Sequence, residues 1–232
     1  MADFNRIYYV ARQTCLEMLI DRGYVVPELL TRLTEKEFEV MFDKKQMDLS
    51  GIIDNEGRPV YVKMIEHTRQ FHKAADRVAL FKEVAKHFNS IGVTSVVDEK
   101  TLTEALDDGK IRLIIIYNSR QPGQLQNKYE EEYMTHGFIE VYQVHQIYIN
   151  PKKLKYQPKF KLITDQEELA KIYRRYDAKP IMLGSTCIDD PINRYYGGRP
   201  AENGKMAHIY EITRDGTNIF YRKVINKRMN IK

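Results

Sequence analysis

The feature that most constrains the fold is the apolar run at residues 111–117, Ile-Arg-Leu-Ile-Ile-Ile-Tyr. A continuous run of aliphatic and β-branched residues is typical of a strand that is buried on both faces of its sheet. Such a strand needs a packed layer on each side. Because helical and strand-like segments alternate around this run, the sequence favours an α/β layer with helices packed on a sheet.

Further strands are predicted on both sides of that run. Residues 49–53 and 59–65 are rich in β-branched residues and flank the turn Asp54-Asn55-Glu56-Gly57, which indicates a hairpin. Other segments with strand character are residues 94–97, 138–142, 207–213 and 218–224.

Helices are predicted where apolar residues recur at intervals of three and four. The longest pattern runs from about residue 68 to residue 89, with a charged opposite face. Thr34 and Glu37 resemble a capping box that opens a short helix, and Gly23 occupies the position of a C-terminal cap. The other predicted helices are residues 4–19, 101–106, 121–134 and 165–176.

Charge is distributed unequally along the 232 residues. Residues 1–150 contain 19 basic and 23 acidic side chains, whereas residues 151–232 contain 18 basic and 9 acidic ones, which gives net charges of −4 and +9. This asymmetry predicts two domains, residues 1–145 and 146–232. The basic C-terminal domain is expected to meet an acidic partner, either nucleic acid or a negatively charged protein surface, although a solvated basic surface remains an alternative.

Several classes of protein are not expected from this sequence. No apolar run approaches the ~20 residues that span a bilayer, so no membrane association is predicted. The N-terminus has no apolar signal core, and Cys15 and Cys187 lie far apart without metal-ligand spacing, which suits a reducing compartment. The common nucleotide-binding, hydrolase and metalloprotease motifs are missing. We therefore expect no catalytic residues, no metal and no cofactor.

One pair of residues raises the possibility of a nuclease. Asp48, followed by Lys63 on the next predicted strand, resembles a metal-dependent nuclease pattern that has a second carboxylate two residues before the lysine. That position is Tyr61, which does not replace a carboxylate ligand of Mg²⁺, and Glu66 has the wrong register. Asp48 and Lys63 are therefore interpreted as fold residues, and a relic metal-dependent nuclease is kept as an alternative.

The segment at residues 189–198 combines a proline, two adjacent tyrosines and a glycine pair. Asp190 is biased away from helix by the following Pro191, and the glycines supply positive φ, so an extended or turning chain is predicted. This chain would present planar and aromatic side chains that often anchor interfaces, namely Arg194, Tyr195 and Tyr196. The alternative is a core-lining segment with one tyrosine buried and the arginine in a local ion pair.

The same segment carries a family resemblance. Residues 190–197, Asp-Pro-Ile-Asn-Arg-Tyr-Tyr-Gly, resemble the Asp-Pro-x-x-Arg-Tyr-Tyr-Gly signature of the fifth-largest subunit of eukaryotic nuclear RNA polymerases, whose C-terminal part is shared with a small subunit of archaeal RNA polymerase. Residues 158–164 resemble that family's Pro-Lys-His-Val-Val-Leu-Thr, and residues 220–222 resemble its closing Thr-Tyr-Arg strand. In the N-terminal half, residues 21–24, Asp-Arg-Gly-Tyr, stand out. Gly184 departs from the family's proline, and the loop at residues 199–205 is longer than usual.

The resemblance implies an α/β protein with an N-terminal, three-layer, nuclease-like jaw domain and a small C-terminal mixed α+β assembly domain. It implies a non-catalytic subunit of a DNA-dependent RNA polymerase, in which the large subunits hold the catalytic site. The implied partners are the largest subunit, other polymerase subunits and downstream duplex DNA. The implied location is the nucleus, or a viral factory or virion if a large DNA virus encodes the chain.

Two sets of site residues follow. The resemblance implies a partner-binding set, which consists of Asp190, Pro191, Arg194, Tyr195, Tyr196, Gly197, Tyr221 and Arg222. A weaker, DNA-proximal set is the row Arg69, Lys73 and Arg77, which follow at i+4 steps and could touch a phosphate backbone. Such a row is more often the solvated face of a helix. DNA contact is therefore expected to be weak and to depend on the complex, and a free-standing nucleic-acid-binding module is the alternative.

Overall fold

The computed structural model describes residues 2–44, 46–66, 74–93, 98–107, 110–118, 139–155, 157–176, 183–199, 206–213 and 218–225. The chain divides into two compact units, Met1–Ile149 and Asn150–Lys232. The change in composition predicts the boundary after residue 145. Each unit contains its own mixed sheet and its own helices, so the protein is of the α/β class.

The N-terminal unit is built on a sheet with the strand order β1-β2-β3-β4. The hairpin strands β1 (Leu49–Ile53) and β2 (Pro59–Ile65) are antiparallel, whereas β3 (Arg112–Tyr117) and β4 (Ile139–Gln143) continue the sheet in parallel. The predicted hairpin and the apolar central strand are confirmed. Every residue of β3 after Arg112 is buried, as expected for a strand that is covered on both faces.

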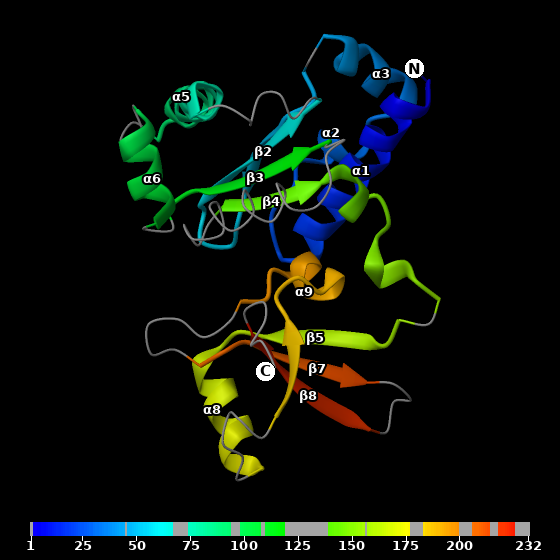
Figure 1. Cartoon of the computed structure of the whole chain (residues 1–232), viewed down its shortest axis with the longest axis vertical. Coiled ribbons are helices and arrows are strands. Elements are labelled where there is room, and N and C mark those ends of the chain that lie inside the picture. Colours follow the sequence, from blue (N-terminus) through cyan, green and yellow to red (C-terminus); the bar gives the residue numbers. More distant parts are fainter. Residues whose placement is uncertain are drawn as a thin grey trace. The chain divides into compact units, whose positions relative to one another are not determined.

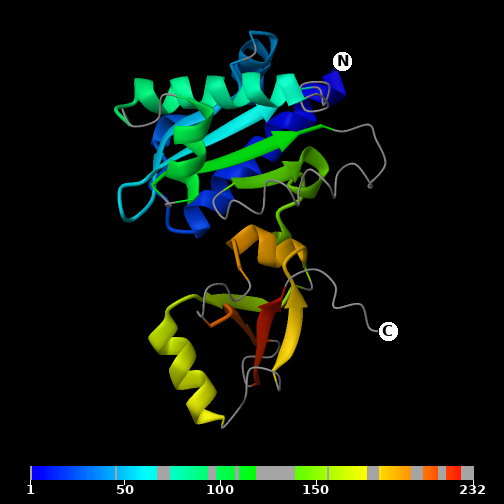
Figure 2. The ribbon, with the colours of Figure 1, turned by 60° about the vertical axis from the view of Figure 1, so that its left-hand side comes forward.

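Helices cover both faces of this sheet (Figures 1 and 2). On one face, α5 (Ala74–Ser90) and α6 (Glu99–Asp107) form a core with β2, β3 and β4. On the other face lie α1 (Ala2–Asp21) and α3 (Glu35–Asp43), which pack on each other, with the short α2 (Glu28–Thr31) beside them. The described residues of this unit therefore form three layers.

The predicted helix ends in this unit are confirmed. The Thr34 side chain accepts a hydrogen bond from the Glu37 amide, and the Glu37 carboxylate accepts one from the Thr34 amide, which completes the capping box of α3. Gly23 has φ of +84° directly after α1, in the left-handed region that glycine enters at little cost. The predicted strand at residues 94–97, the predicted helix at residues 121–134 and the first residues of the long predicted helix lie outside the described residues.

The C-terminal unit has a second sheet with the order β5-β7-β8-β6. Strands β5 (Lys159–Ile163), β7 (Ile209–Thr213) and β8 (Ile219–Ile225) are antiparallel neighbours, and β6 (Gly184–Cys187) pairs in parallel with β8. Helix α8 (Gln166–Arg175) packs on one face through Leu169 and Ile172. The opposite face carries Tyr210, Ile212 and Val224, against which Tyr196 of α9 (Pro191–Tyr196) packs. The short 3-10 helix η2 (Pro151–Lys153) precedes β5, whereas η1 (Val144–Gln146) follows β4 in the N-terminal unit.

Two further observations concern the described residues as a whole. None of their helices combines the length and the apolar character that a bilayer span requires. Both cysteines are free thiols: Cys15 is a buried residue of α1, and Cys187 is partly buried at the end of β6.

Candidate partner-binding site

The predicted recognition segment is a short helix rather than an extended or turning chain. Asp190 itself is extended, with φ of −56° and ψ of 130°, and its side chain accepts a hydrogen bond from the Ile192 amide. Pro191 then occupies the first helical position, where its fixed φ fits a helix and its missing N–H removes no intrahelical hydrogen bond. The extended or turning chain predicted for the segment at residues 189–198 is therefore wrong for residues 191–196, because the bias before proline acts on Asp190 alone.

The glycine pair serves two different purposes. Gly197 has φ of +69° and caps the C-terminus of α9 in the left-handed region, as predicted. The φ of Gly198 is not positive, so its backbone conformation does not require glycine. A Cβ at this position, however, would lie 3.1 Å from the Tyr210 ring and 3.2 Å from Asn193 Oδ1. Gly198 is thus required by the close packing of α9 against β7.

The arginine and the first tyrosine of the segment are largely buried. Arg194 is 9% exposed and Tyr195 is 3% exposed, whereas Tyr196 is only partly buried. The Tyr195 hydroxyl accepts a hydrogen bond from Asn150 Nδ2 at 3.1 Å, and its ring lies edge-on to the Tyr196 ring at 5.2 Å. These side chains hold α9 in position, so the exposed surface of the helix comes from other residues, such as Pro191.

Asn193 is a structural centre of this region that the sequence interpretation did not single out. Its side chain is fully buried, and Nδ2 donates to the Cys187 carbonyl at 2.5 Å and to Thr186 Oγ1 at 3.2 Å. The Tyr210 hydroxyl donates to the Ile192 carbonyl at 3.2 Å from the neighbouring strand. Together these bonds tie α9 to β6 and β7. The sequence did contain a signal for this role, because Asn193 lies among apolar and aromatic residues. A polar side chain that is buried in such a stretch generally forms hydrogen bonds.

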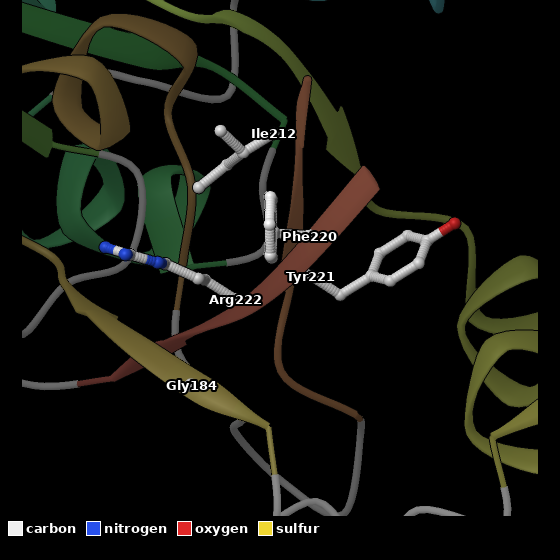
Figure 3. Close-up of a pocket in the computed structure, with 5 residues that line it drawn as sticks. All are labelled: Gly184, Ile212, Phe220, Tyr221 and Arg222. Carbon is white, nitrogen blue, oxygen red and sulfur yellow. The ribbon is translucent and has the colours of Figure 1, made fainter. Parts of the chain in front are cut away.

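A hollow of about 320 Å³ lies on the face of the C-terminal sheet that α9 also covers. It is lined by Gly184 of β6, Ile212 of β7, and Phe220, Tyr221 and Arg222 of β8. Figure 3 shows Ile212, Phe220 and Arg222 on one side of the β8 ribbon, whereas the Tyr221 ring extends on the other side, toward α8. Strand alternation thus separates two predicted site residues. Arg222 shares the face of α9, but Tyr221 packs with Tyr176 at 5.5 Å between ring centres.

The N-terminal motif at residues 21–24 also has a clear structural role. Arg22 donates to both carboxylate oxygens of Glu140 on β4, at 2.7 and 2.9 Å, and to the Tyr142 hydroxyl at 3.0 Å. Burial disfavours the charged guanidinium, but Glu140, together with Tyr142 and Tyr24, outweighs burial and raises the pKa of Arg22. Tyr24 lies beneath the Arg112 guanidinium, 5.9 Å from it. The motif therefore fastens the end of α1 to the sheet.

Comparison with known proteins extends the resemblance beyond the C-terminal signature. No protein-family model matches the chain. A protein of Arabidopsis thaliana, "DNA-directed RNA polymerases IV and V subunit 5B", is 23% identical to this chain over 220 residues, which are 94% of this chain and 89% of that protein. The resemblance to the fifth-subunit family of eukaryotic RNA polymerases is confirmed. Because the aligned part covers both units, the fifth-subunit resemblance includes the N-terminal half, where the sequence alone shows little more than residues 21–24.

Asp48 and Lys63, which resemble a nuclease pattern, do come together in the structure of this chain. Asp48 Oδ2 accepts hydrogen bonds from Tyr61 at 2.6 Å and from Lys63 at 2.8 Å, and Oδ1 accepts one from the Met64 amide at 2.8 Å. Lys63 also pairs with Glu83 of α5 at 2.6 Å. Burial disfavours the ammonium, but the Asp48 and Glu83 carboxylates together outweigh burial and raise the pKa of Lys63.

This arrangement leaves the Asp48 carboxylate engaged by donors rather than open to a cation. Burial, followed by the Asp48 charge, raises the pKa of Tyr61, so the residue at the second carboxylate position is a neutral donor. Within the described residues, no group of three histidine, cysteine or acidic side chains is placed to hold a metal ion. The Asp48 cluster joins the start of β1, β2 and α5 within the N-terminal unit.

The predicted DNA-proximal row cannot be placed in the same way. Arg69 and Lys73 lie outside the described residues, and Arg77 is described only as part of the α5 backbone. Their role therefore stays a prediction.

Proposed function

We propose that this protein is a non-catalytic subunit of a multisubunit DNA-directed RNA polymerase. The observation that carries the proposal is the similarity over 94% of the chain to a plant protein named as a subunit of polymerases IV and V. The C-terminal unit docks on the largest subunit, and the N-terminal unit forms part of the jaw near downstream DNA. The protein acts in the nucleus, where such polymerases transcribe.

The docking surface consists of α9 and the adjoining face of the C-terminal sheet. Support comes from the way in which α9 is held, through Asp190 at its N-terminus, Asn193 at its centre and Gly197 at its C-terminus. A surface that is rigid before binding loses less conformational entropy when the partner docks. The buried Arg194 and Tyr195 contribute to the interface mainly by fixing this geometry.

The experiment is affinity purification of the tagged full-length chain from its native cells, followed by quantitative mass spectrometry. We expect the largest polymerase subunits in a constant ratio to the tagged chain, and none with the tag alone. Recovery of the folded chain without any polymerase subunit contradicts the proposed function.

DNA contact is proposed to be weak for the isolated chain and to depend on the assembled polymerase. The N-terminal residues 1–150 carry a net charge of −4, which opposes the counterion release that drives non-specific binding. In fluorescence anisotropy with duplex DNA at physiological salt, we expect a Kd no tighter than about 10⁻⁶ M and no sequence preference. Tighter, sequence-selective binding supports the free-standing nucleic-acid-binding module instead.

A further inference from the structure

We propose that the hollow on the α9-covered face of the C-terminal sheet receives an apolar side chain from an acidic segment of the largest polymerase subunit. The inference rests on the proposed function and specifies the chemistry of the docking contact. The hollow is lined by Gly184, Ile212, Phe220 and Arg222 on the side that faces away from α8.

The apolar side chains that line the hollow favour an apolar occupant. Phe220 lies directly opposite Ile212 in the β7–β8 ladder, so both side chains belong to the same face. Ile212 is 8% exposed, whereas Phe220 is 52% exposed, and its ring therefore lies open at the mouth. Burial of that ring against a partner's apolar side chain removes its exposed surface from water, which favours association.

Gly184 keeps the hollow open. Its backbone has no positive φ, so the conformation itself does not require glycine. A Cβ at this position would lie 3.7 Å from Arg222 Cγ, in ordinary contact distance. The missing side chain thus leaves space above β6, and the aliphatic stem of Arg222 forms the adjacent wall.

The volume and lining fit an anchoring side chain better than a cofactor. About 320 Å³ is at the lower limit of small-molecule pockets, which measure roughly 300–1,000 Å³. Such pockets need several convergent polar groups to orient a ligand. Among the residues that line the hollow, Arg222 supplies the polar side chain on this face, since the Tyr221 hydroxyl lies on the α8 side.

The charge around the hollow selects an acidic partner. Arg222 is exposed, and among the residues that the structure describes none forms an ion pair or hydrogen bond with its guanidinium. Residues 151–232 carry a net charge of +9. A guanidinium pairs with a carboxylate through two parallel hydrogen bonds. A partner segment in which an apolar residue is flanked by Asp or Glu would therefore fill the hollow and pair with the Arg222 guanidinium.

The test compares variants of the tagged full-length chain in the same purification. Arg222→Glu reverses the charge of an exposed residue, and Gly184→Leu fills the hollow. Lys171→Glu is the matched control, because it makes the same charge change on an exposed position of α8, across the sheet. Thermal melts of each purified variant verify folding.

We expect Arg222→Glu and Gly184→Leu each to lower recovery of the largest subunit at least about tenfold, the loss typical of an interface anchor. Lys171→Glu should recover it as the wild type does. On an array of overlapping peptides covering the largest subunit, the wild-type chain should bind acidic peptides that contain an apolar residue. Arg222→Glu should lose them.

The outcomes separate the two proposals. If the wild type recovers the largest subunit and both folded hollow variants recover it equally, the inference is overturned and the proposed function stands. If the wild type recovers no polymerase subunit, the proposed function fails, and the partner named here fails with it. If Arg222→Glu weakens duplex DNA binding while subunit recovery is unchanged, the surface faces nucleic acid and the inference is overturned.

Discussion

The Asp48 cluster of the N-terminal unit and the hollow of the C-terminal unit differ in how their charges are satisfied. In the cluster, Asp48, Tyr61 and Lys63 bond to one another and to the backbone, so the donors and acceptors are consumed inside the fold. At the hollow, Phe220 and Arg222 are exposed. A charged cluster with nuclease-like spacing therefore stabilises the fold, whereas the exposed apolar strand face with its single charge has the chemistry proposed above for a docking surface.

The largest expected effect is that of Asp48→Ala. It removes the acceptor of Lys63, Tyr61 and the Met64 amide, and the unfolding free energy should fall by about 3 kcal/mol, since breaking a buried ion pair costs about 3–5. Urea unfolding followed by circular dichroism measures it. Asp48→Asn, which retains one acceptor oxygen, should lose less. A loss below about 1 kcal/mol would show that the cluster behaves like an exposed pair, and the contrast with the hollow would disappear.

Asn193→Ala tests whether the C-terminal unit also relies on hydrogen bonds from a buried polar side chain. The substitution removes two hydrogen bonds that join α9 to β6, and the expected loss is about 2 kcal/mol, within the range for an unsatisfied buried group. Ser185→Ala on the exposed part of β6 is the control and should change stability by less than about 0.5 kcal/mol. Equal melting temperatures for the two variants would show that Asn193 does not secure α9.

Alkaline pH should weaken the N-terminal unit through Tyr61 and Lys63. Both pKa values are raised in the folded protein, so their contribution is complete below their ordinary values near 10 and is lost as pH rises beyond them. We expect the unfolding free energy to decline above about pH 10. Tyr61→Phe should cost about 1 kcal/mol at pH 7 and make this decline shallower. An unchanged slope in Tyr61→Phe would exclude Tyr61 as its source.

The smallest effect is expected at an exposed ion pair. Lys161 and Glu168 pair at 3.0 Å on the α8 side of the C-terminal sheet, with side chains 60% and 43% exposed. Lys161→Ala should cost no more than about 0.5 kcal/mol, because solvent screens such pairs. The loss should shrink further at about 0.5 M salt, where the screening length is shorter. If Lys161→Ala lost nearly as much unfolding free energy as Asp48→Ala, burial would not explain the difference between the Asp48 cluster and the exposed Lys161–Glu168 pair.

The elements that depend on local periodicity and capping could be predicted from the sequence. The apolar run became β3, and the Thr34 capping box and the Gly23 cap lie where their residue types require. These signals work because each is decided within a few residues. The same holds for the β7–β8 pair, although its turn lies outside the described residues.

The elements that depend on distant partners could not be predicted in this way. β6, with the sequence Gly-Ser-Thr-Cys, has no apolar alternation, and pairing with β8 makes it a strand. β5 does alternate Lys, Phe, Lys and Leu, so its signal was present but was not interpreted as a strand. For α9, the sequence reveals Pro191 but not that a helix begins there. The burial of Tyr195 depends on Asn150, which is remote in sequence.

The strand order β5-β7-β8-β6 has a consequence for synthesis. β8 lies between β7 and β6, both of which leave the ribosome earlier, so β6 has no described neighbour in the sheet until residues 219–225 are made. Phe220 and Arg222 belong to that same late strand. A nascent or truncated chain that lacks β8 therefore lacks both the complete sheet and the hollow, so the proposed docking surface forms only when the C-terminal fold is completed.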